Sequence, residues 1–548
     1  MTYQIKYLFF ILLLPFNLFA QKNTPQQPKL IVGVVVDQMR YDYLYKYWDS
    51  MGDKGFKRLL GEGFSFDNCQ FDYVPTYTGP GHSCIFTGTT PSTNGIVSNN
   101  WYDRKLGASI YCADDSTVQT VGSSTAAVGK MSPNNLLSTT IGDELRIATN
   151  FRARVVGVAL KDRSCILPAG RGGNAAYWFD GTTGNFVSST YYMTELPKWM
   201  QLFNEQKLPQ KYLSKPWETI QPLSIYQKYC APDDNRYEGL FSGEKRSVFP
   251  HNLPAITAEL KTFDVLRVTP WGNTITKDIA LAALENEKLG KGDVTDMLTI
   301  SFSSPDYIGH QFGPQSVEVM DNYLRLDKDI ADLLSYLDKN YGKNNVLLFL
   351  TADHGAAQNI VYMQDHKLAS GSIDVDDILL KLRSFAAQNY ADSNMVEAYD
   401  NQQVYLNHQI VAAKKLNLAT VQQQFADFML IQTGVAQTIT ATELQRNEFS
   451  EPSLALMQRG FYAKRSGDVL VNYEPGWMDW GLKGTSHGSP FSYDTHVPLI
   501  WYGYGIKHGS SSVYVRVKDI ASTISVYLHI PFTNGNTGQP LNSYMKRK

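Results

Sequence analysis

Five short apolar runs, rich in β-branched and aromatic residues, are the clearest pattern in this sequence. Four of them end at Val36, Leu160, Phe302 and Leu350, and the fifth begins at Val497. Such uninterrupted runs are typical of strands in a sheet that is covered on both faces, so they predict an α/β fold with a central, mostly parallel sheet. No G-x-G-x-x-G motif follows the first run, which argues against a dinucleotide-binding domain.

A long amphipathic helix is predicted between the third and fourth runs. From Ser316 to Tyr341, apolar residues recur at steps of three and four positions, and Gly342 supplies a helix stop. A strand, a helix and a second strand in this order form a parallel crossover unit. We therefore expect one large domain over residues 21–548, with helices on both faces of its sheet.

Two stretches do not follow this alternation of strand and helix. Residues at about 164–271 are rich in aromatic residues, glycine and proline, and residues at about 358–480 mix amphipathic helix with short strand patterns. We interpret both stretches as insertions into the core domain.

The first twenty residues predict a signal peptide. Lys6 precedes an apolar run from Tyr7 to Leu14, and Ala20 supplies a small residue at the expected cleavage site. A membrane anchor is the alternative, but the run is shorter than the ~20 residues that a bilayer requires, and Pro15 interrupts it. Because no later segment is apolar enough to span a membrane, we expect a periplasmic or secreted protein.

Composition excludes several classes of protein. Of the 548 residues, 43% are hydrophobic and 19% are charged, which excludes a disordered chain. Fifty Lys and Arg against 52 Asp and Glu give a formal net charge of −2 without a basic run, so we expect no nucleic-acid scaffold. The five cysteines contain no C-x2-C pair, so a transition metal would need His and carboxylate ligands. We expect a monomer that acts on small molecules.

Charged residues directly follow four of the predicted strands. They are Asp37, the tripeptide Lys161-Asp162-Arg163, Asp306, and the pair Asp353-His354. The carboxyl ends of parallel strands lie at one edge of a sheet, where α/β proteins bind ligands. A single Asp at such a place often only caps the next helix or turn. Four strands with the same pattern indicate a shared site.

Two of these segments have the spacing of metal ligands. Asp306 and His310 are four residues apart, so one helical turn would place both side chains on one face. Asp353 and His354 are adjacent and can face one ion only where the strand has ended, as Gly355 permits. Either motif alone is a weak signal, because a buried His is more often a satisfied core residue.

The segment T-G-P-G-H from Thr78 to His82 predicts the start of a helix. We expect Thr78 at the N-cap and Pro80 in the first turn, where a missing N–H costs little. The functional alternative is a hydroxyl nucleophile that a nearby dication activates. The capping pattern fits both interpretations.

Taken together, these motifs resemble the alkaline phosphatase superfamily, in which they occur in the same order. The resemblance is greatest to the secreted, phosphate-irrepressible alkaline phosphatases of Bacteroidetes, the PafA type, and it covers nearly the whole mature chain. It implies an alkaline-phosphatase-like core with inserted cap segments. The motifs are Asp37, T-G-P-G-H, N-N-W-Y-D with Asn99, K-D-R, D-Y-I-G-H, A-D-H-G, G-F-Y-A-K-R-S-G-D-V-L-V, G-T-S-H and Y-D-T-H-V-P-L.

The resemblance also implies two zinc ions per chain, with Thr78 between them as nucleophile and metal ligand. His82 and His496 lie within the motifs, but we expect them to support or pack against the site without binding metal. Two such dications can together polarise the attacking and departing oxygens of a phosphoryl transfer. The implied ligands are Asp306, His310 and His487 for one ion, and Asp37, Asp353 and His354 for the other.

Asn99, Lys161 and Arg163 match the side chains that hold phosphate in this family, although each alone could be a structural or solvated polar residue. The implied activity is hydrolysis of phosphate monoesters through a phosphothreonine, with release of inorganic phosphate. The closest alternative is a nucleotide pyrophosphatase/phosphodiesterase of the same superfamily, against which Lys161 and Arg163 argue. A sulfatase would need Cys or Ser where this chain has Thr78, and a non-catalytic exported binding protein is the remaining alternative.

Overall fold

The computed structural model describes residues 27–545, and the predicted signal peptide lies outside them. Its centre is an eleven-stranded sheet in the order β18-β2-β17-β10-β1-β9-β6-β7-β8-β5, with β19 beside β2. In this order the strands span Gly509–Ser511, Phe64–Gln70, His496–Gly503, Val346–Thr351, Leu30–Val36, Asp296–Phe302, Val155–Ala159, Ala175–Asp180, Asn185–Ser189 and Thr120–Val121, and β19 spans Val515–Arg516.

The middle of this sheet is parallel, as predicted. Strands β10, β1, β9, β6 and β7 all run in one direction, and β1, β9 and β10 are buried along their whole length. The run that begins at Val497 belongs to β17, which pairs antiparallel with β10. Val36 is paired with Phe302 and Val35 with Thr351, so the central strands end level with one another. The residues that follow these strands therefore lie close together at one edge of the sheet.

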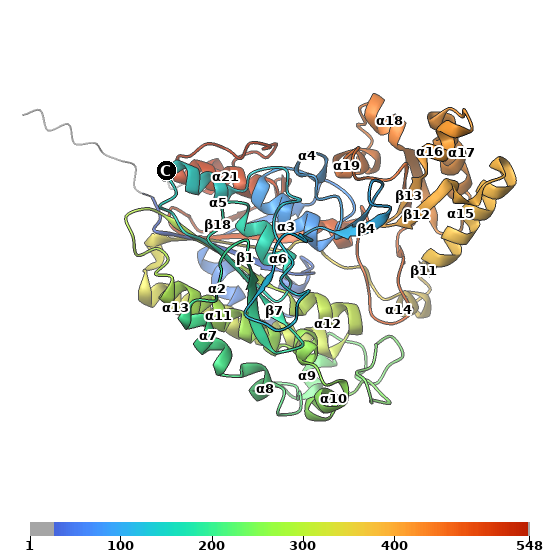
Figure 1. Cartoon of the computed structure of the whole chain (residues 1–548). Coiled ribbons are helices and arrows are strands. Elements are labelled where there is room, and N and C mark those ends of the chain that lie inside the picture. The colour runs from blue at the N-terminus through green and yellow to red at the C-terminus, as the bar shows by residue number, and fades with distance from the viewer. Residues whose placement is uncertain (1–26, 546–548) are drawn as a thin grey trace, which may run out of the picture.

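Helices cover both faces of the sheet, as Figure 1 shows. One face carries α3 (Thr78–Thr87), α5 (Ile141–Ala148), α6 (Arg163–Ala169) and α21 (Asp519–Leu528). The other carries α2 (Phe56–Glu62), α11 (Trp271–Asn286) and α13 (Val317–Asn340). This two-sided cover explains why the central strands contain no polar face. Among the described residues, no helix has both the length and the hydropathy required to cross a bilayer.

Helix α13 agrees closely with the helix predicted from Ser316 to Tyr341. The Ser316 side chain is its N-cap and accepts a hydrogen bond from Val319 N. Its apolar side, which includes Leu326, Ile330 and Leu333, is buried in the main core. The periodicity of the sequence thus identified the helix and the face that it buries.

The segment predicted as the second insertion builds a sheet of its own. This four-stranded sheet has the order β12-β13-β15-β14 and lies beside the core in Figure 1. A separate hydrophobic core, which includes Leu382, Phe425 and Val471, joins it to its helices. The elements are α15 (Val375–Tyr390), β12 (Val396–Asp400), β13 (Gln403–Leu406), α16 (His408–Ala413), α17 (Leu418–Leu430), β14 (Val435–Thr440), α18 (Ala441–Arg446), α19 (Pro452–Gly460) and β15 (Val469–Tyr473).

The segment predicted as the first insertion begins within the central sheet. Strand β7 pairs parallel with β6, and β8 pairs antiparallel with β7. Strands β7 and β8 of this segment are therefore part of the sheet, and the residues after Ser189 lie outside it. Aromatic and glycine content concealed these strands, because aromatic residues also favour strands and a strand does not need a continuous aliphatic run. The helices that follow are α7 (Lys198–Glu205), α8 (Leu208–Tyr212), α9 (Leu223–Tyr226) and α10 (Leu253–Leu260).

A buried imidazole joins this segment to α13. His251 is fully buried, with Nδ1 lying 3.0 Å from Glu244 Oε1 and Nε2 lying 3.1 Å from Glu318 Oε1. Burial opposes its charge, but these two hydrogen-bonded carboxylates raise the pKa of His251 to about 9. The folded protein therefore binds a proton that the unfolded chain releases between pH 6.5 and about 9.

We expect the free energy of unfolding to fall as the pH rises from 6.5 to about 9, by about 3 kcal/mol from this group. Thermal unfolding measured across this range would show the fall, and His251→Gln should make it shallower. His366→Gln, at an exposed position, is the matched control and should keep the wild-type slope. Equal slopes for wild type and His251→Gln would contradict the prediction.

Candidate active site

The ends of the central strands bring the predicted ligands together. Asp37 follows β1, Asp353 and His354 follow β10, and β9 leads into α12 (Ser304–Phe312), which carries Asp306. His487 joins them from the loop before α20 (Ser492–Thr495). Within the described chain, two groups of three side chains bring metal-binding atoms within 4.8 Å of one another. They are Asp306, His310 and His487, here called triad 1, and Asp37, Asp353 and His354, called triad 2.

Triad 1 is arranged around Asp306. One turn of α12 places His310 Nε2 3.1 Å from Asp306 Oδ1, as the spacing of four residues predicted. His487 Nε2 lies 3.7 Å from the same oxygen. Ligand atoms bound at 2.0–2.1 Å to a tetrahedral zinc ion lie about 3.4 Å apart, so this spacing fits a shared ion.

Triad 2 has similar spacing and is deeply buried. His354 Nε2 lies 3.6 Å from Asp37 Oδ1 and 3.7 Å from Asp353 Oδ2, and all three side chains are 0% exposed. Asp37 Oδ1 accepts no hydrogen bond within the described residues, and outside the triad Asp353 Oδ2 has only the His82 ring, at 3.2 Å. Buried carboxylate oxygens without partners are costly, and a bound cation would stabilise them.

The three histidines are oriented in the same way. In each, Nδ1 lies within hydrogen-bond distance of a backbone carbonyl, and Nε2 faces the triad. Donation from Nδ1 fixes the tautomer in which Nε2 has a free lone pair, which is the form that binds metal. The carbonyls belong to Thr485 for His310 (2.8 Å), Gly355 for His354 (2.9 Å) and Thr76 for His487 (2.7 Å).

The electrostatics of the triads also favour a bound cation. Burial and the negative charge of Asp353 raise the pKa of Asp37 well above its usual range. Burial and the nearby imidazoles of His354 and His310 lower the pKa of His487 well below its usual range, so that its ring is neutral. Neutral imidazoles and carboxylates without thiolates suit zinc, and a dication would also keep Asp37 ionised.

Thr78 lies beside triad 2 at the start of α3. Its Oγ1 is 3.5 Å from His354 Nε2, and the residue is 1% exposed. Thr78 is the first residue of the helix, and the N-cap is Tyr77, so the predicted capping role is wrong. A Cβ at Gly81 would collide with the Asp353 backbone, so glycine lets α3 approach triad 2 this closely. The hydroxyl is therefore aimed at the site and is not needed to cap the helix.

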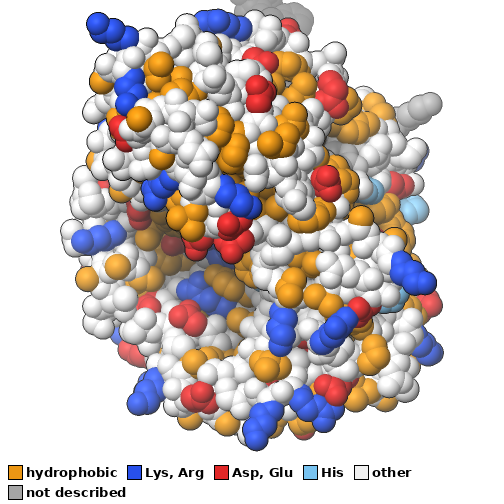
Figure 2. Space-filling view, turned by 90° about the vertical axis from the view of Figure 1, so that its right-hand side faces the viewer, with side chains coloured by type: hydrophobic (Ala, Val, Ile, Leu, Met, Phe, Trp, Pro, Cys, Tyr) orange, Lys and Arg blue, Asp and Glu red, His pale blue; other side chains and the backbone are white. Residues whose placement is uncertain are grey.

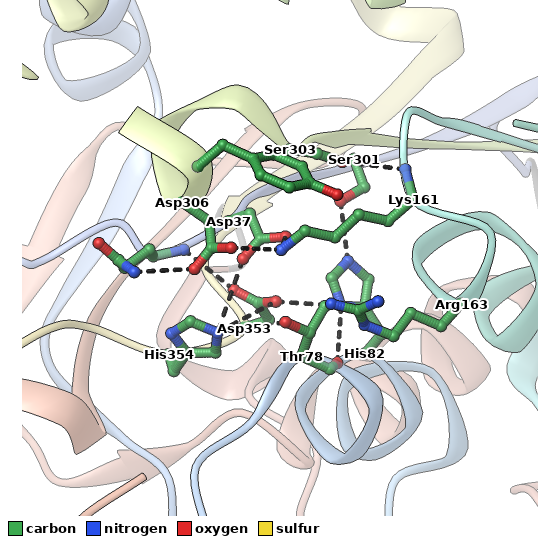
Figure 3. A network of polar contacts seen from close by, with 12 residues as sticks. Asp37, Thr78, His82, Lys161, Arg163, Ser301, Ser303, Asp306, Asp353 and His354 are labelled. Atoms are coloured by element: carbon green, nitrogen blue, oxygen red, sulfur yellow. Dashed lines mark hydrogen bonds and ion pairs between the residues drawn. The ribbon is translucent and has the colours of Figure 1, made fainter. Parts of the chain in front are cut away.

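Two cations and one amide surround this hydroxyl. Lys161 Nζ donates to Asp37 Oδ2 (2.8 Å) and Asp306 Oδ2 (2.5 Å), so it spans one carboxylate of each triad. Figure 3 shows Lys161, Arg163 and Thr78 gathered around the carboxylates. Asn99 Oδ1 accepts from the N–H of Gly79 (2.7 Å), which fixes the amide beside the nucleophile and leaves Nδ2 free to donate.

The two remaining motif histidines lie outside the triads. His82 Nδ1 is 2.9 Å from Thr78 O and 3.2 Å from Asp353 Oδ2, and its Nε2 is 2.8 Å from Ser301 Oγ. These contacts position Asp353 and the start of α3. His496 Nε2 lies 3.0 Å from the Asp67 carbonyl, and its ring stacks on Tyr41.

Sequence reasoning missed Gln38, which contacts both triads. Its N–H donates to Asp353 Oδ1 (3.2 Å), and its Nε2 donates to Asp306 Oδ1 (2.8 Å). Its φ of 61° is left-handed, a conformation that a non-glycine residue adopts at some cost. A Cβ at Gly309 would collide with Gln38 Oε1, which explains the glycine in D-Y-I-G-H. Gly309 was therefore the residue of the sequence that could have indicated a close neighbour such as Gln38.

Arg163 is held by a neighbour that the sequence also did not indicate. Its Nη1 donates to Tyr111 OH (3.0 Å), and that hydroxyl donates to Asp162.

Figure 2 shows a hollow on one face of the molecule with basic side chains in its depth and acidic ones along its upper margin. An anion that enters such a hollow meets positive charge although the whole chain has a formal charge of −2.

Comparison with known proteins agrees with this geometry. The family model described as type I phosphodiesterase/nucleotide pyrophosphatase matches residues 31–489, which contain both triads and Thr78. A protein of Elizabethkingia meningoseptica named alkaline phosphatase PafA is 43% identical over 544 residues, 99% of each chain. The chain belongs to the PafA type of this family.

A solved structure and two further relatives are similarly close to this chain. The crystal structure of PafA superposes with a TM-score of 0.92 at 42% identity, covering 96% of this chain and all of that one. Alkaline phosphatase PhoV of Synechococcus elongatus is 42% identical over 96% of this chain and 94% of its own. A Myroides odoratus protein named calcium-transporting ATPase is 44% identical over 95% of each chain.

Proposed function

We propose that this protein is a zinc-dependent phosphatase that hydrolyses phosphate monoesters through a phosphothreonine at Thr78. The chain is an enzyme of the phosphoric monoester hydrolase class, to which its relatives named alkaline phosphatases belong. The observation that carries the proposal is the position of Thr78, whose buried hydroxyl lies 3.5 Å from His354 of triad 2. The His354 ring in turn stacks on His487 of triad 1, so the two triads adjoin one another beside this hydroxyl. The N-terminal pattern supports export to the periplasm or beyond, and two zinc ions are the proposed cofactor.

The side chains divide the reaction between them. Triad 1 and triad 2 would each hold one zinc ion, which when bound supplies positive charge that lowers the pKa of a hydroxyl and polarises phosphoryl oxygens. Asn99 Nδ2, Lys161 and Arg163 donate to the remaining phosphoryl oxygens and hold the phosphorus in line with Thr78 Oγ1. Because Thr78 is the first residue of α3, the positive end of the helix dipole also lies beside the phosphoryl group.

Two displacements complete the proposed cycle. Thr78 Oγ1 loses its proton and forms a bond to phosphorus, and the ester oxygen departs with its bonding electrons and takes up a proton as the alcohol leaves. Water then attacks the phosphorus, the Thr78 Oγ1–P bond breaks, a proton from the water returns to Thr78 Oγ1, and inorganic phosphate is released. Each step needs the same positive surroundings, because negative charge develops on the phosphoryl oxygens both times.

The test of this function compares a monoester with a diester. A monoester presents three non-bridging oxygens, whereas a diester replaces one of them with a second alkoxy group, which Lys161 and Arg163 cannot hold. Removing both cations by Lys161→Ala with Arg163→Ala should lower kcat/KM for an aryl monoester at least about a hundredfold. The loss for the matching methyl diester should be much smaller.

The matched control is Lys343→Ala, a lysine that precedes the amino end of β10 and pairs with Glu62. This variant should leave both rates unchanged. Equal losses on both substrates in the double variant would mean that the two cations only support the fold. A wild-type preference for the diester would favour the phosphodiesterase alternative.

A further inference from the structure

The motif G-F-Y-A-K-R-S-G-D-V-L-V lies in the second inserted segment, yet one of its side chains enters the core. The motif forms the connection between α19 and β15. Arg465 extends from it and donates through Nη1 to the carbonyls of Gly95 and Asn135, the latter at 2.8 Å. Its guanidinium also lies 4.8 Å from the centre of the Trp101 ring. The partners of this guanidinium are therefore two backbone carbonyls and an aromatic ring.

These contacts lie on both sides of Asn99. Gly95 ends α4 (Pro91–Asn94) in a left-handed conformation, and Trp101 belongs to β3 (Asn100–Asp103) and is 1% exposed. Arg465 therefore holds the short segment from Gly95 to Trp101 at its two ends. The Asn99 carbonyl accepts from Cys112 N (2.8 Å), and its side chain bonds Gly79 N, so Asn99 has one defined position.

The chain that follows Asn99 has two further contacts with the inserted unit. Arg104 donates to the Ser466 carbonyl (2.9 Å) and to Asp468 Oδ2 (2.8 Å). Asn401 Nδ2 donates to the Asn100 carbonyl (2.8 Å). Together with the contact between Arg465 and Gly95, the inserted unit therefore contacts the chain on both sides of a proposed phosphate-holding residue.

Arg465 could instead serve only to dock the inserted unit onto the core. Another part of the interface argues against that role. Helix α19 packs against the segment before Thr78, where Val74 N donates to the Leu456 carbonyl (3.2 Å) and Val74 joins a shared apolar cluster. Because Arg459 also pairs with Asp72 there, docking has contacts that do not involve Arg465.

We propose that Arg465 is a positioning residue, which acts from the inserted unit by fixing the Asn99 segment so that the Asn99 amide meets the phosphoryl group. The proposal rests on the phosphatase function proposed above. It gives the inserted unit a part in phosphate recognition, although none of its residues belongs to either triad.

A double-mutant cycle tests the proposal with an aryl phosphate monoester as substrate. Because misplacing a substrate-holding group by ~1 Å can lower a rate about a hundredfold, we expect Arg465→Met to lower kcat/KM by roughly tenfold or more. The loss should largely disappear in an Asn99→Ala background and persist in a Lys161→Ala background. Equal losses in both backgrounds would overturn the proposal. Arg171→Met is the matched control, because Arg171 caps the nearby Leu136 carbonyl without touching the Asn99 segment, and it should leave kcat/KM unchanged.

Hydrogen exchange supplies a readout that does not depend on activity. In Arg465→Met, the backbone amides of residues 95–101 should exchange faster, with Arg465→Lys intermediate, while those of β1 and β9 stay unchanged. Unchanged exchange over residues 95–101 would overturn the proposal whatever the activity. Faster exchange in a protein whose wild type turns over no monoester would instead refute the proposed function.

Discussion

Thr78→Ala is expected to lower kcat/KM for an aryl phosphate monoester by at least about a thousandfold, because removal of a nucleophile removes the covalent route. The loss should be in kcat, with both metals and the fold retained, since Thr78 Oγ1 makes no capping hydrogen bond. Acid quenching of the wild type during turnover, followed by peptide mass mapping, should locate phosphate on Thr78.

Thr87→Ala is the matched control for this prediction. Thr87 lies at the other end of α3, where its hydroxyl donates to the Ser83 carbonyl (2.6 Å). It should retain nearly wild-type kcat/KM. Phosphate trapped on another residue, or a Thr78→Ala variant with full activity, would remove Thr78 from the role of nucleophile.

Zinc removal is expected to have an effect of similar size. The purified protein should contain about two zinc ions per chain, and exhaustive chelation should abolish turnover until zinc is restored. A substitution in one triad should reduce the content to about one ion, so His310→Ala and Asp353→Ala should each lose one by elemental analysis. This readout is independent of activity.

The matched control for the metal prediction is His496→Ala. His496 lies in the same set of sequence motifs but contacts the Asp67 carbonyl and Tyr41 instead of a triad. It should keep two zinc ions per chain. Full activity after zinc removal, or purified protein that contains only magnesium or calcium, would overturn the assignment of zinc.

The sequence was most informative where a local pattern has one structural solution. Continuous apolar runs indicated buried parallel strands, and β1, β6, β9 and β10 lie where they were predicted. The spacing of Asp306 and His310 fixed their geometry, because four residues make about one helical turn. Thr78 shows the limit, since the pattern fitted an N-cap equally well and the structure begins the helix one residue earlier than expected.

The predicted ligand sets coincide with the two groups that the structure brings together, although their metal-binding role stays a prediction. That agreement came from motif order, not from spacing. Spacing alone could join Asp306 to His310, or Asp353 to His354, but it could not assign His487 to Asp306 across the chain. Strands β7 and β8 were similarly hidden, since they lack the aliphatic runs of the central strands.

The sequence by itself determined the fold class, the strand ends that carry the charged residues, and the family. Only the tertiary structure decided which of those residues touch. Gln38 contacts both triads, and Arg465 contacts Gly95 across 370 positions of sequence. Such pairs leave no local signal, because a hydrogen bond between distant segments depends on how helices and sheets pack, whereas strand and helix patterns depend on neighbours a few residues away.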